Sequence, residues 1–268
     1  EEAFTISVTD LDDTAPVIAL TGPSAITHEA VTVFADAGAT WTDAVDGSGN
    51  ATVSGAVSVN APGTYTLTYS KIDAAGNAAA TLTRTVEVVD MTKPVIVLGG
   101  TETAAHEAVT VYADGGATWT DTLDGNGSLV AAGTVNANVP GSYILTYSKT
   151  DVAGNAATQV TRTVTVTDTT KPVISLTGSA TVTHEAATSY SDGGATWTDT
   201  LDGNGSLVAV GSVNVNVPGV YTLTYDFTDA AGNAADQITR TVTVADSTKP
   251  VIALTGSATV THEAATAY

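Results

Sequence analysis

A short acidic segment occurs three times in the chain and has the residue types of a cation site. Its second occurrence reads Asp121-Thr-Leu-Asp124-Gly-Asn126-Gly-Ser. Several side-chain oxygens around glycine bends are what a hard cation such as Ca²⁺ requires. The spacing is not that of an EF-hand, because no Glu follows at the twelfth position. The candidate Ca²⁺ ligands are Asp43, Asp46, Asp121, Asp124, Asn126, Asp199, Asp202 and Asn204.

Two alternatives stand beside this metal site. The segment could be a plain Asp/Asn/Gly turn that is capped by its own side chains. A separate acidic site could instead form where one repeat meets the next, since Asp90, Asp168 and Asp246 precede a Lys-Pro pair. Lysines three residues further on argue for simple solvated linkers there. The segment from Asp10 to Asp13 is the most acidic of these linkers.

Buried arginines form a second group that needs partners. Arg84, Arg162 and Arg240 fall in phase with the inward-facing valines of a predicted strand. A buried guanidinium must find a carboxylate or reach water along its stem. The candidate carboxylates are Glu29, Glu107 and Glu185. Each follows a His, but neighbours on a strand point to opposite faces, so a His-Glu pair cannot chelate one metal.

Residues for covalent or acid–base catalysis are poorly represented. Cysteine is absent, and every His occupies the same repeated position. A nucleophile would need an adjacent base and an oxyanion hole. Paired carboxylates such as Asp121 and Asp124 would need a substrate cleft between them, which a small β-domain hardly offers. We therefore expect no enzymatic activity.

The charge and composition restrict the partners of the chain. With 28 acidic residues against 8 Lys and Arg, the formal net charge is -20, which repels nucleic acid and anionic membranes. Without cysteines there is neither a disulfide nor a thiolate site. No apolar stretch of about 18 residues and no signal peptide are apparent, so we expect no direct membrane insertion.

The sequence repeats itself every 78 residues, as from Pro16 to Pro94 and from Pro94 to Pro172. That period is too long for a solenoid, whose repeats run about 20 to 50 residues, and suits one small domain per copy. We predict modules at 16–93, 94–171 and 172–249, called copies one, two and three below. Residues 1–15 are assigned to the last strand and linker of a preceding module, and residues 250–268 to the opening of a following, truncated one.

Within a copy the periodicity is that of β-strands. Tyr221, Leu223 and Tyr225 alternate with threonines, and the turn Asp229-Ala-Ala-Gly-Asn233 joins this run to a second alternating run. About seven short strands and no helix start are predicted per copy, which fits a sandwich of the Ig type. The expected core residues are Trp41, Trp119 and Trp197, with Tyr65, Tyr143 and Tyr221 at the Ig tyrosine-corner position.

The recurring strings TKPVIxLTG, GATWTDxxDG, PGxYxLTY and DxAGNxA resemble the bacterial surface Ig-like tandem repeats related to HYR-type modules. The resemblance covers essentially the whole chain. It implies all-β modules arranged as beads on a string, and it implies spacer or adhesive roles without catalytic residues to carry over.

The predicted function is an extracellular structural or adhesive region, a stalk or fibre of a large bacterial surface protein that calcium rigidifies. Its expected partners are neighbouring Ig-like modules of the same chain and, through self-association into fibres, other copies. One alternative is a module that binds a glycan or a protein through its loops. Another is a subunit of an extracellular filament or surface lattice.

Overall fold

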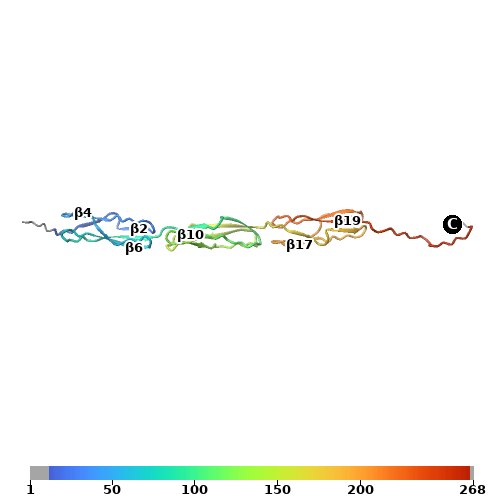
Figure 1. Ribbon diagram of the computed structural model, residues 1–268, viewed down its shortest axis with the longest axis horizontal. Coiled ribbons are helices and arrows are strands. Elements are labelled where there is room, and N and C mark those ends of the chain that lie inside the picture. The colour runs from blue at the N-terminus through green and yellow to red at the C-terminus, as the bar shows by residue number, and fades with distance from the viewer. Residues whose placement is uncertain (1–11, 266–268) are drawn as a thin grey trace, which may run out of the picture. The chain divides into compact units, whose positions relative to one another are not determined.

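The computed structural model describes residues 12–265, and these contain nineteen β-strands and no helix (Figure 1). The predicted all-β fold class is confirmed. Most of the segment 1–15, assigned above to a preceding module, lies outside the described residues, as do the last three residues of 250–268.

Copy one consists of seven strands in two sheets. The strands are β1 (Val17–Leu20), β2 (Ala25–Glu29), β3 (Ala39–Asp43), β4 (Gly47–Asn50), β5 (Thr52–Ser54), β6 (Gly63–Ser70) and β7 (Leu82–Val89). The first sheet has the order β1-β3-β4, and the second has the order β2-β7-β6-β5. β2 runs parallel to β7, whereas β6 and β7 are antiparallel.

Copies two and three have six strands each. In copy two they are β8 (Val95–Leu98), β9 (Thr103–Glu107), β10 (Ala117–Asp121), β11 (Gly125–Leu129), β12 (Gly141–Tyr147) and β13 (Val160–Thr167). In copy three they are β14 (Val173–Leu176), β15 (Thr181–Glu185), β16 (Ala195–Asp199), β17 (Gly203–Leu207), β18 (Gly219–Tyr225) and β19 (Ile238–Ala245). The counterpart of β5 is reduced to single bridges, Ala132 to Thr146 and Val210 to Thr224.

Alternation along β18 and β19 produces the sandwich of copy three. The two strands pair antiparallel over their whole length, with Tyr221 opposite Val242 and Leu223 opposite Arg240. Leu223, Tyr225 and Val242 are buried, while the threonines between them face outward. Because strand side chains alternate between faces, each strand contributes every second residue to the core. The long hairpin predicted around the Asp229 turn is therefore present.

The predicted tryptophans and tyrosines take structural positions. Trp41 is buried in the core of copy one, and Trp197 packs against that of copy three. Lys149 lies over the ring of Trp119, 4.2 Å from its centroid. The hydroxyl of Tyr65 donates to the Ala61 carbonyl at 2.7 Å, and that of Tyr221 donates to the Val217 carbonyl at 2.8 Å. These are the bonds of an Ig tyrosine corner.

The buried arginines pair with aspartates, so the prediction of Glu29, Glu107 and Glu185 as their partners is wrong. Arg84 has no exposed side-chain surface and forms an ion pair with Asp36. Its guanidinium also donates to the backbone carbonyls of Thr21, Pro23 and Gly38. Arg162 with Asp114 and Arg240 with Asp192 repeat the pair. The segment after β2 folds back over the sandwich and brings the aspartate to the arginine, which strand phase alone does not reveal.

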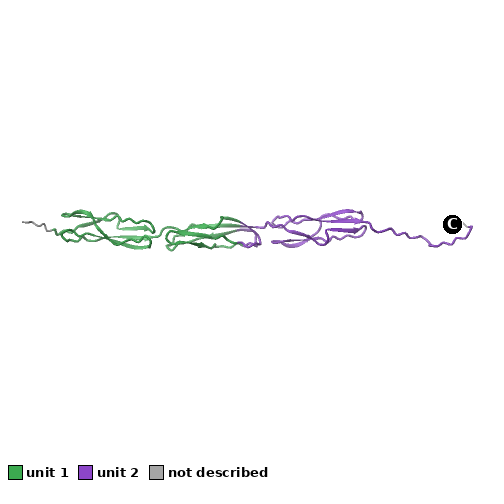
Figure 2. Cartoon of the chain, viewed as in Figure 1, with its two compact units in different colours: residues 1–104, 113–135, 143–164 green, residues 105–112, 136–142, 165–268 purple. Residues whose placement is uncertain are grey.

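The chain divides into two compact units, which Figure 2 shows in different colours. Unit 1 comprises residues 1–104, 113–135 and 143–164, and unit 2 comprises residues 105–112, 136–142 and 165–268.

Candidate metal centre

Three aspartates meet at each of three places in the described part of the chain. In each group, one carboxylate oxygen from every aspartate lies within 4.8 Å of the others. We call these groups the aspartate clusters. They consist of Asp12, Asp43 and Asp73; of Asp90, Asp121 and Asp151; and of Asp168, Asp199 and Asp229.

The members of a cluster come from two successive copies. In the second cluster, Asp90 directly follows β7, the last strand of copy one, and so lies in the linker. Asp121 is the final residue of β10, and Asp151 begins the Asp-Val-Ala-Gly-Asn turn after β12, both in copy two. The cluster therefore joins the linker to two loops at the beginning of the next copy.

One oxygen of Asp121 caps its own turn. Its Oδ1 accepts hydrogen bonds from the backbone N–H groups of Leu123, at 2.8 Å, and Asp124, at 2.9 Å. Oδ1 of Asp90 likewise accepts from the N–H of Thr92 at 3.1 Å. The turn interpretation therefore accounts for Oδ1 of these two carboxylates but not for Oδ2.

The second oxygen of these aspartates is buried and has no hydrogen-bond partner. This is true of Oδ2 in Asp90 and Asp121, and equally in the first and third clusters in Asp12, Asp43, Asp168 and Asp199. Asp90 as a whole is only 7% exposed, and Asp168 8%. A buried polar atom without a partner is costly, and a charged one more so. The same unpartnered oxygens recur at all three clusters.

The third aspartate is held rigidly and also anchors the linker. Asn155 donates its backbone N–H to Oδ1 of Asp151 at 2.6 Å and its side-chain amide to Oδ2 at 2.7 Å. The same amide donates to the backbone carbonyl of Asp90 at 3.0 Å. Asn77 and Asn233 repeat this bridge to the carbonyls of Asp12 and Asp168.

Only part of the predicted ligand set enters the clusters. Asp43, Asp121 and Asp199 do. Oδ2 of Asp124 instead accepts from the backbone N–H of Val152 at 2.7 Å, which fastens the two loops together. Asp46 and Asp202 make the same bond to Ala74 and Ala230. Asn126 and Asn204 lie on β11 and β17, opposite Thr120 and Thr198.

In the second and third clusters, burial and the neighbouring carboxylates shift the pKa of the linker aspartate. Burial raises the pKa of Asp90, and the nearby carboxylates of Asp121, Asp151 and Glu29 raise it further. The pKa of Asp168 is raised by the same causes in the third cluster. Burial also acts on Asp151, but hydrogen bonds from Asn155 and the turn backbone outweigh it and lower its pKa. The second and third clusters thus each combine a turn aspartate whose pKa is lowered with a linker aspartate whose pKa is raised.

The glutamate that ends β2 in copy one, and its counterpart that ends β9 in copy two, hold the linker that follows the copy. Glu107 accepts hydrogen bonds from the N–H of Thr169 at 3.0 Å and from the hydroxyl of Thr170 at 2.8 Å. The hydroxyl of Thr169 also donates to Glu107, and together these bonds lower the pKa of Glu107 to about 2, with the Thr169 hydroxyl as the largest cause. Glu29 holds Met91 and Thr92 in the same way. The glutamates that sequence reasoning assigned to arginine therefore position the linker aspartate.

A leucine from the loop adds an apolar contact. Leu123 lies between Asp121 and Asp124 and packs against the buried core cluster of copy one. The loop thus carries an aspartate into the cluster and a hydrophobic side chain onto the preceding copy. Both contacts hold the end of copy one to the beginning of copy two.

Asp73, Asp151 and Asp229 are the site residues that sequence reasoning missed. From the sequence, each of them was interpreted only as the first residue of a turn, and the linker aspartates were assigned to a separate site. The sequence did contain a signal for these aspartates, because each recurs at the 78-residue step with an Asn four residues after it. Only the fold shows that linker, loop and turn converge.

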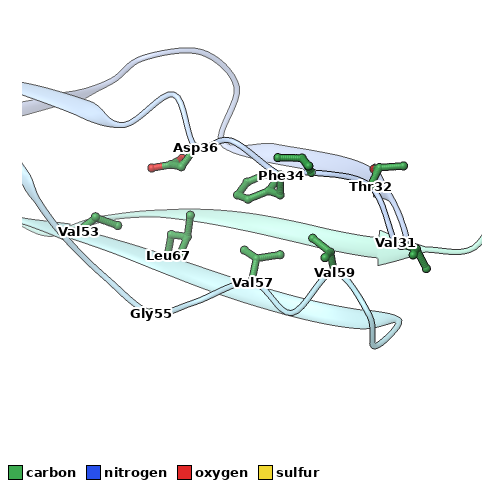
Figure 3. A pocket seen from close by; sticks show the side chains of 10 residues that line it. Val31, Thr32, Phe34, Asp36, Val53, Gly55, Val57, Val59 and Leu67 are labelled. Carbon is green, nitrogen blue, oxygen red and sulfur yellow. The ribbon is translucent and has the colours of Figure 1, made fainter.

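An open groove of about 550 Å³ lies on copy one (Figure 3). Phe34, Val57 and Leu67 are among its lining residues, and Asp36 lies at one end. The carboxylate of Asp36 accepts hydrogen bonds from Arg84 and from the Tyr69 hydroxyl, whose pKa is raised to about 12 by burial and by Asp36. Asp36 is thus engaged in holding the sandwich together.

The two-sheet sandwich, the tyrosine corner and the threefold repeat define a protein of tandem Ig-like modules. The profile of the family described as "Bacterial surface protein, Ig-like domain" matches residues 18–88, 96–166 and 174–244. The chain therefore belongs to this family and carries three copies of its domain.

Two curated relatives are sea-urchin proteins named hyalin. That of Strongylocentrotus purpuratus is 30% identical over 291 aligned residues, which cover 97% of this chain and 23% of hyalin. That of Lytechinus variegatus is 31% identical over 288 residues, covering 93% and 50%. The chain thus spans half or less of the length of these relatives.

Solved structures align weakly. The lipoprotein BT2262 from Bacteroides thetaiotaomicron gives a TM-score of 0.25 at 21% identity, covering 48% of this chain and 60% of that one. A structure from a 1.5-MDa bacterial ice-binding adhesin gives 0.22 at 15% identity, covering 78% and 82%.

The chain is accordingly a surface Ig-like repeat region. Its family consists of surface repeat domains that are typically non-catalytic. Among the described residues, no helix has the length and hydrophobicity to cross a membrane.

Proposed function

We propose that the chain is a non-catalytic structural or adhesive segment of a larger surface protein and that its aspartate clusters bind Ca²⁺ where copies meet. The supporting observation is the pair of buried, unpartnered carboxylate oxygens at each cluster. A bound cation would supply the partner that both oxygens lack.

Calcium is the cation that this ligand chemistry favours. Ca²⁺ binds six to eight oxygens at about 2.3–2.6 Å, so two ligands on opposite sides of it lie about 5 Å apart. The carboxylate oxygens of a cluster lie within 4.8 Å of one another, which matches that span. Because the described residues provide only carboxylates there and no His, the cluster suits a hard cation better than zinc or copper.

Binding would stabilise one arrangement of linker and loops. The cation would join Asp90 of the linker to Asp121 and Asp151 of copy two, beside the Asn155 and Glu29 hydrogen bonds. A ligand that binds only the folded arrangement stabilises it by about 2.7 kcal/mol when its free concentration is 100 times the dissociation constant. The role proposed is thus mechanical: cations hold consecutive Ig-like copies in a fixed relation.

The test is calorimetric titration of the metal-free chain with Ca²⁺, followed by thermal unfolding with calcium and with chelator. We expect three ions per chain and a rise in Tm of several degrees with calcium. Asp121→Asn should remove one ion and lower the gain. The control Asp226→Asn makes the same charge change at an exposed residue and should leave three ions bound.

Absence of calcium binding at millimolar concentration would refute the cation proposal. Mg²⁺ binding of equal strength would refute the choice of calcium. The first result would favour a metal-independent spacer, and the second a spacer that binds divalent cations without selectivity. Sedimentation of the same samples would detect self-association into fibres.

A further inference from the structure

We propose that the open groove on copy one, and its counterpart on copy three, each bind an extended peptide segment of a partner protein as an added β-strand. The peptide is apolar at every second residue and carries Lys or Arg at its ends. None of the residues that line either groove belongs to an aspartate cluster. Peptide binding there is therefore independent of the calcium proposal.

The same groove occurs on copy three, where its volume is about 350 Å³. Several residues that line it stand two repeat steps after residues that line the groove on copy one. These are Asp192, Gly211, Val213 and Leu223, which correspond to Asp36, Gly55, Val57 and Leu67. The opening is therefore a feature of the repeat rather than an accident of one copy.

An extended segment without a backbone partner forms one border of the groove on copy one. Residues 31–37 follow β2, and their side chains alternate as on a strand. Phe34 and Asp36 are half-buried, whereas Val33 and Ala35 are exposed, Val33 to 92%. Within the described residues 12–265, no other backbone group pairs with the backbone of 33–37. The segment thus has the unpaired N–H and C=O groups of an edge strand.

A glycine creates the opposite border. β5 pairs with β6 as far as Ser54, which lies opposite Thr68. Gly55 then adopts a φ of 99°, and a Cβ atom at this position would collide with the carbonyl oxygen of Thr66. Only glycine fits such a position, and the positive φ turns the chain out of the ladder. Residues 55–57 are consequently left without a backbone partner in the described part of the chain.

A single backbone hydrogen bond closes one end of the groove. The N–H of Val31 donates to the carbonyl of Val59 at 2.8 Å, and both residues lie at the same end of the opening (Figure 3). On copy three, Ala187 and Val215 form the same bond at 2.8 Å. Beyond this bond the two borders separate, so space remains between two unpaired backbone segments.

An extended peptide fits this space because its backbone groups can pair with either border. Such β-augmentation of an exposed edge is a common mode of peptide recognition. Natural edge strands are usually protected by Lys, Pro or a bulge, but residues 31–37 contain neither Lys nor Pro. At about 3.3 Å per residue, the segment would be matched by a peptide of about seven residues.

The side chains of the groove favour apolar residues in the peptide. Phe34 and Leu67 point toward one another across the opening, and Val57 lies beside them (Figure 3). Phe34 and Val57 pack against the buried core cluster, and Leu67 belongs to it. Because an extended chain presents every second side chain to one face, alternate apolar residues would enter the groove.

Charge selects the partner. The net charge of -20 repels acidic chains, a second copy of this chain included, and attracts a cationic peptide. Among the described residues that line the groove on copy one, Asp36 alone is charged, and it is already paired with Arg84. The cationic residues of the peptide therefore belong at its ends, outside the apolar part of the groove.

The first experiment titrates the labelled peptide Lys-Val-Thr-Val-Thr-Val-Lys with the full chain in chelator and follows fluorescence anisotropy. Main-chain hydrogen bonds supply the affinity in β-augmentation, so a generic strand-forming peptide is a sufficient probe. We expect saturable binding. The same peptide with N-methylated central amides should bind at least tenfold more weakly, as should a peptide with Glu in place of both Lys. No binding at millimolar peptide, or equal binding of either control peptide, would overturn the inference.

The second experiment locates the peptide and uses the absence of cysteine. The thiol of a Val53→Cys variant, in the groove of copy one, should react with a maleimide at least tenfold more slowly when the peptide is saturating. The control Ile72→Cys, at a 61% exposed residue outside the groove, should react at the same rate with and without peptide. Unchanged reactivity of Val53→Cys would overturn the assignment of the groove. Protection that appears without peptide on raising the chain concentration would identify a second copy as the occupant and overturn the cationic partner.

Discussion

At the scale of single residues, the chain stabilises each sandwich with one buried charge. Arg240 is almost fully buried and donates to Asp192 and to the carbonyls of Thr177, Ser179 and Gly194. We predict that Arg240→Met lowers the stability of copy three by about 3–5 kcal/mol, because Asp192 and three carbonyls lose their donor. Calorimetry should show one unfolding transition displaced to lower temperature.

The matched control for Arg240 is Lys171→Met. Lys171 pairs with Asp236 at 3.3 Å, but both side chains are exposed, so the change should cost less than about 1 kcal/mol. If the two variants unfolded alike, the buried network would not be the stabilising feature we describe.

A second residue-scale feature is strain at the corner after β2. Val31 has a φ of 59° and Val109 a φ of 61°, in the left-handed region that a β-branched residue rarely adopts. We predict that Val109→Asn raises stability by about 1 kcal/mol, since Asn tolerates this conformation and the Val side chain is already 44% exposed. Chemical denaturation would measure it. Val111→Asn, at a 95% exposed residue without a positive φ, should be neutral.

At the scale of elements, the loop between β10 and β11 connects consecutive copies through both charge and hydrophobic contact. We predict that Leu123→Ala destabilises the junction by about 1–2 kcal/mol, since its packing on the core of copy one is lost. The unfolding transition of copy one should move to lower temperature although the mutation lies in copy two. Val130→Ala, 94% exposed in the same copy, should leave that transition in place. Loss of stability confined to copy two would contradict the contact.

At the scale of the whole molecule, the net charge is -20. Repulsion between carboxylates is strongest at the aspartate clusters, where three of them lie close together. In metal-free protein, burial and neighbouring carboxylates raise the pKa of Asp90 and Asp168 above the unfolded value of about 3.9. At these two groups the folded chain then binds more protons than the unfolded one, so stability should rise as pH falls from 7 to about 5. Below that range it should fall, because the pKa of Asp36 and of Glu107 is lowered.

Thermal unfolding in chelator across this pH range would measure the effect. Saturating calcium should reverse the slope, because protons then compete with the cation for the same oxygens. The double variant Asp90→Asn, Asp168→Asn should lose most of the metal-free rise. A steady loss of stability from pH 7 to pH 5 in chelator would contradict the pKa assignments.

The sequence by itself determined the repeat, the strand phase and the fold class. These follow from local information: a 78-residue period, alternation at every second residue and turn-forming Asp, Asn and Gly. The tyrosine corners and the burial of the arginines were predictable for the same reason. The family to which the chain belongs was also recognisable from its recurring motifs.

Only the tertiary structure decided which side chains meet. The linker aspartate, the loop aspartate and the turn aspartate lie about 30 residues apart in the chain, and their convergence depends on how two copies are joined. The choice of Asp36 for Arg84, and of the linker for Glu29, likewise depends on a segment that folds back over the sandwich. Periodicity fixes the face on which a side chain lies, but distances across a fold depend on strand order and loop path, which no local pattern encodes.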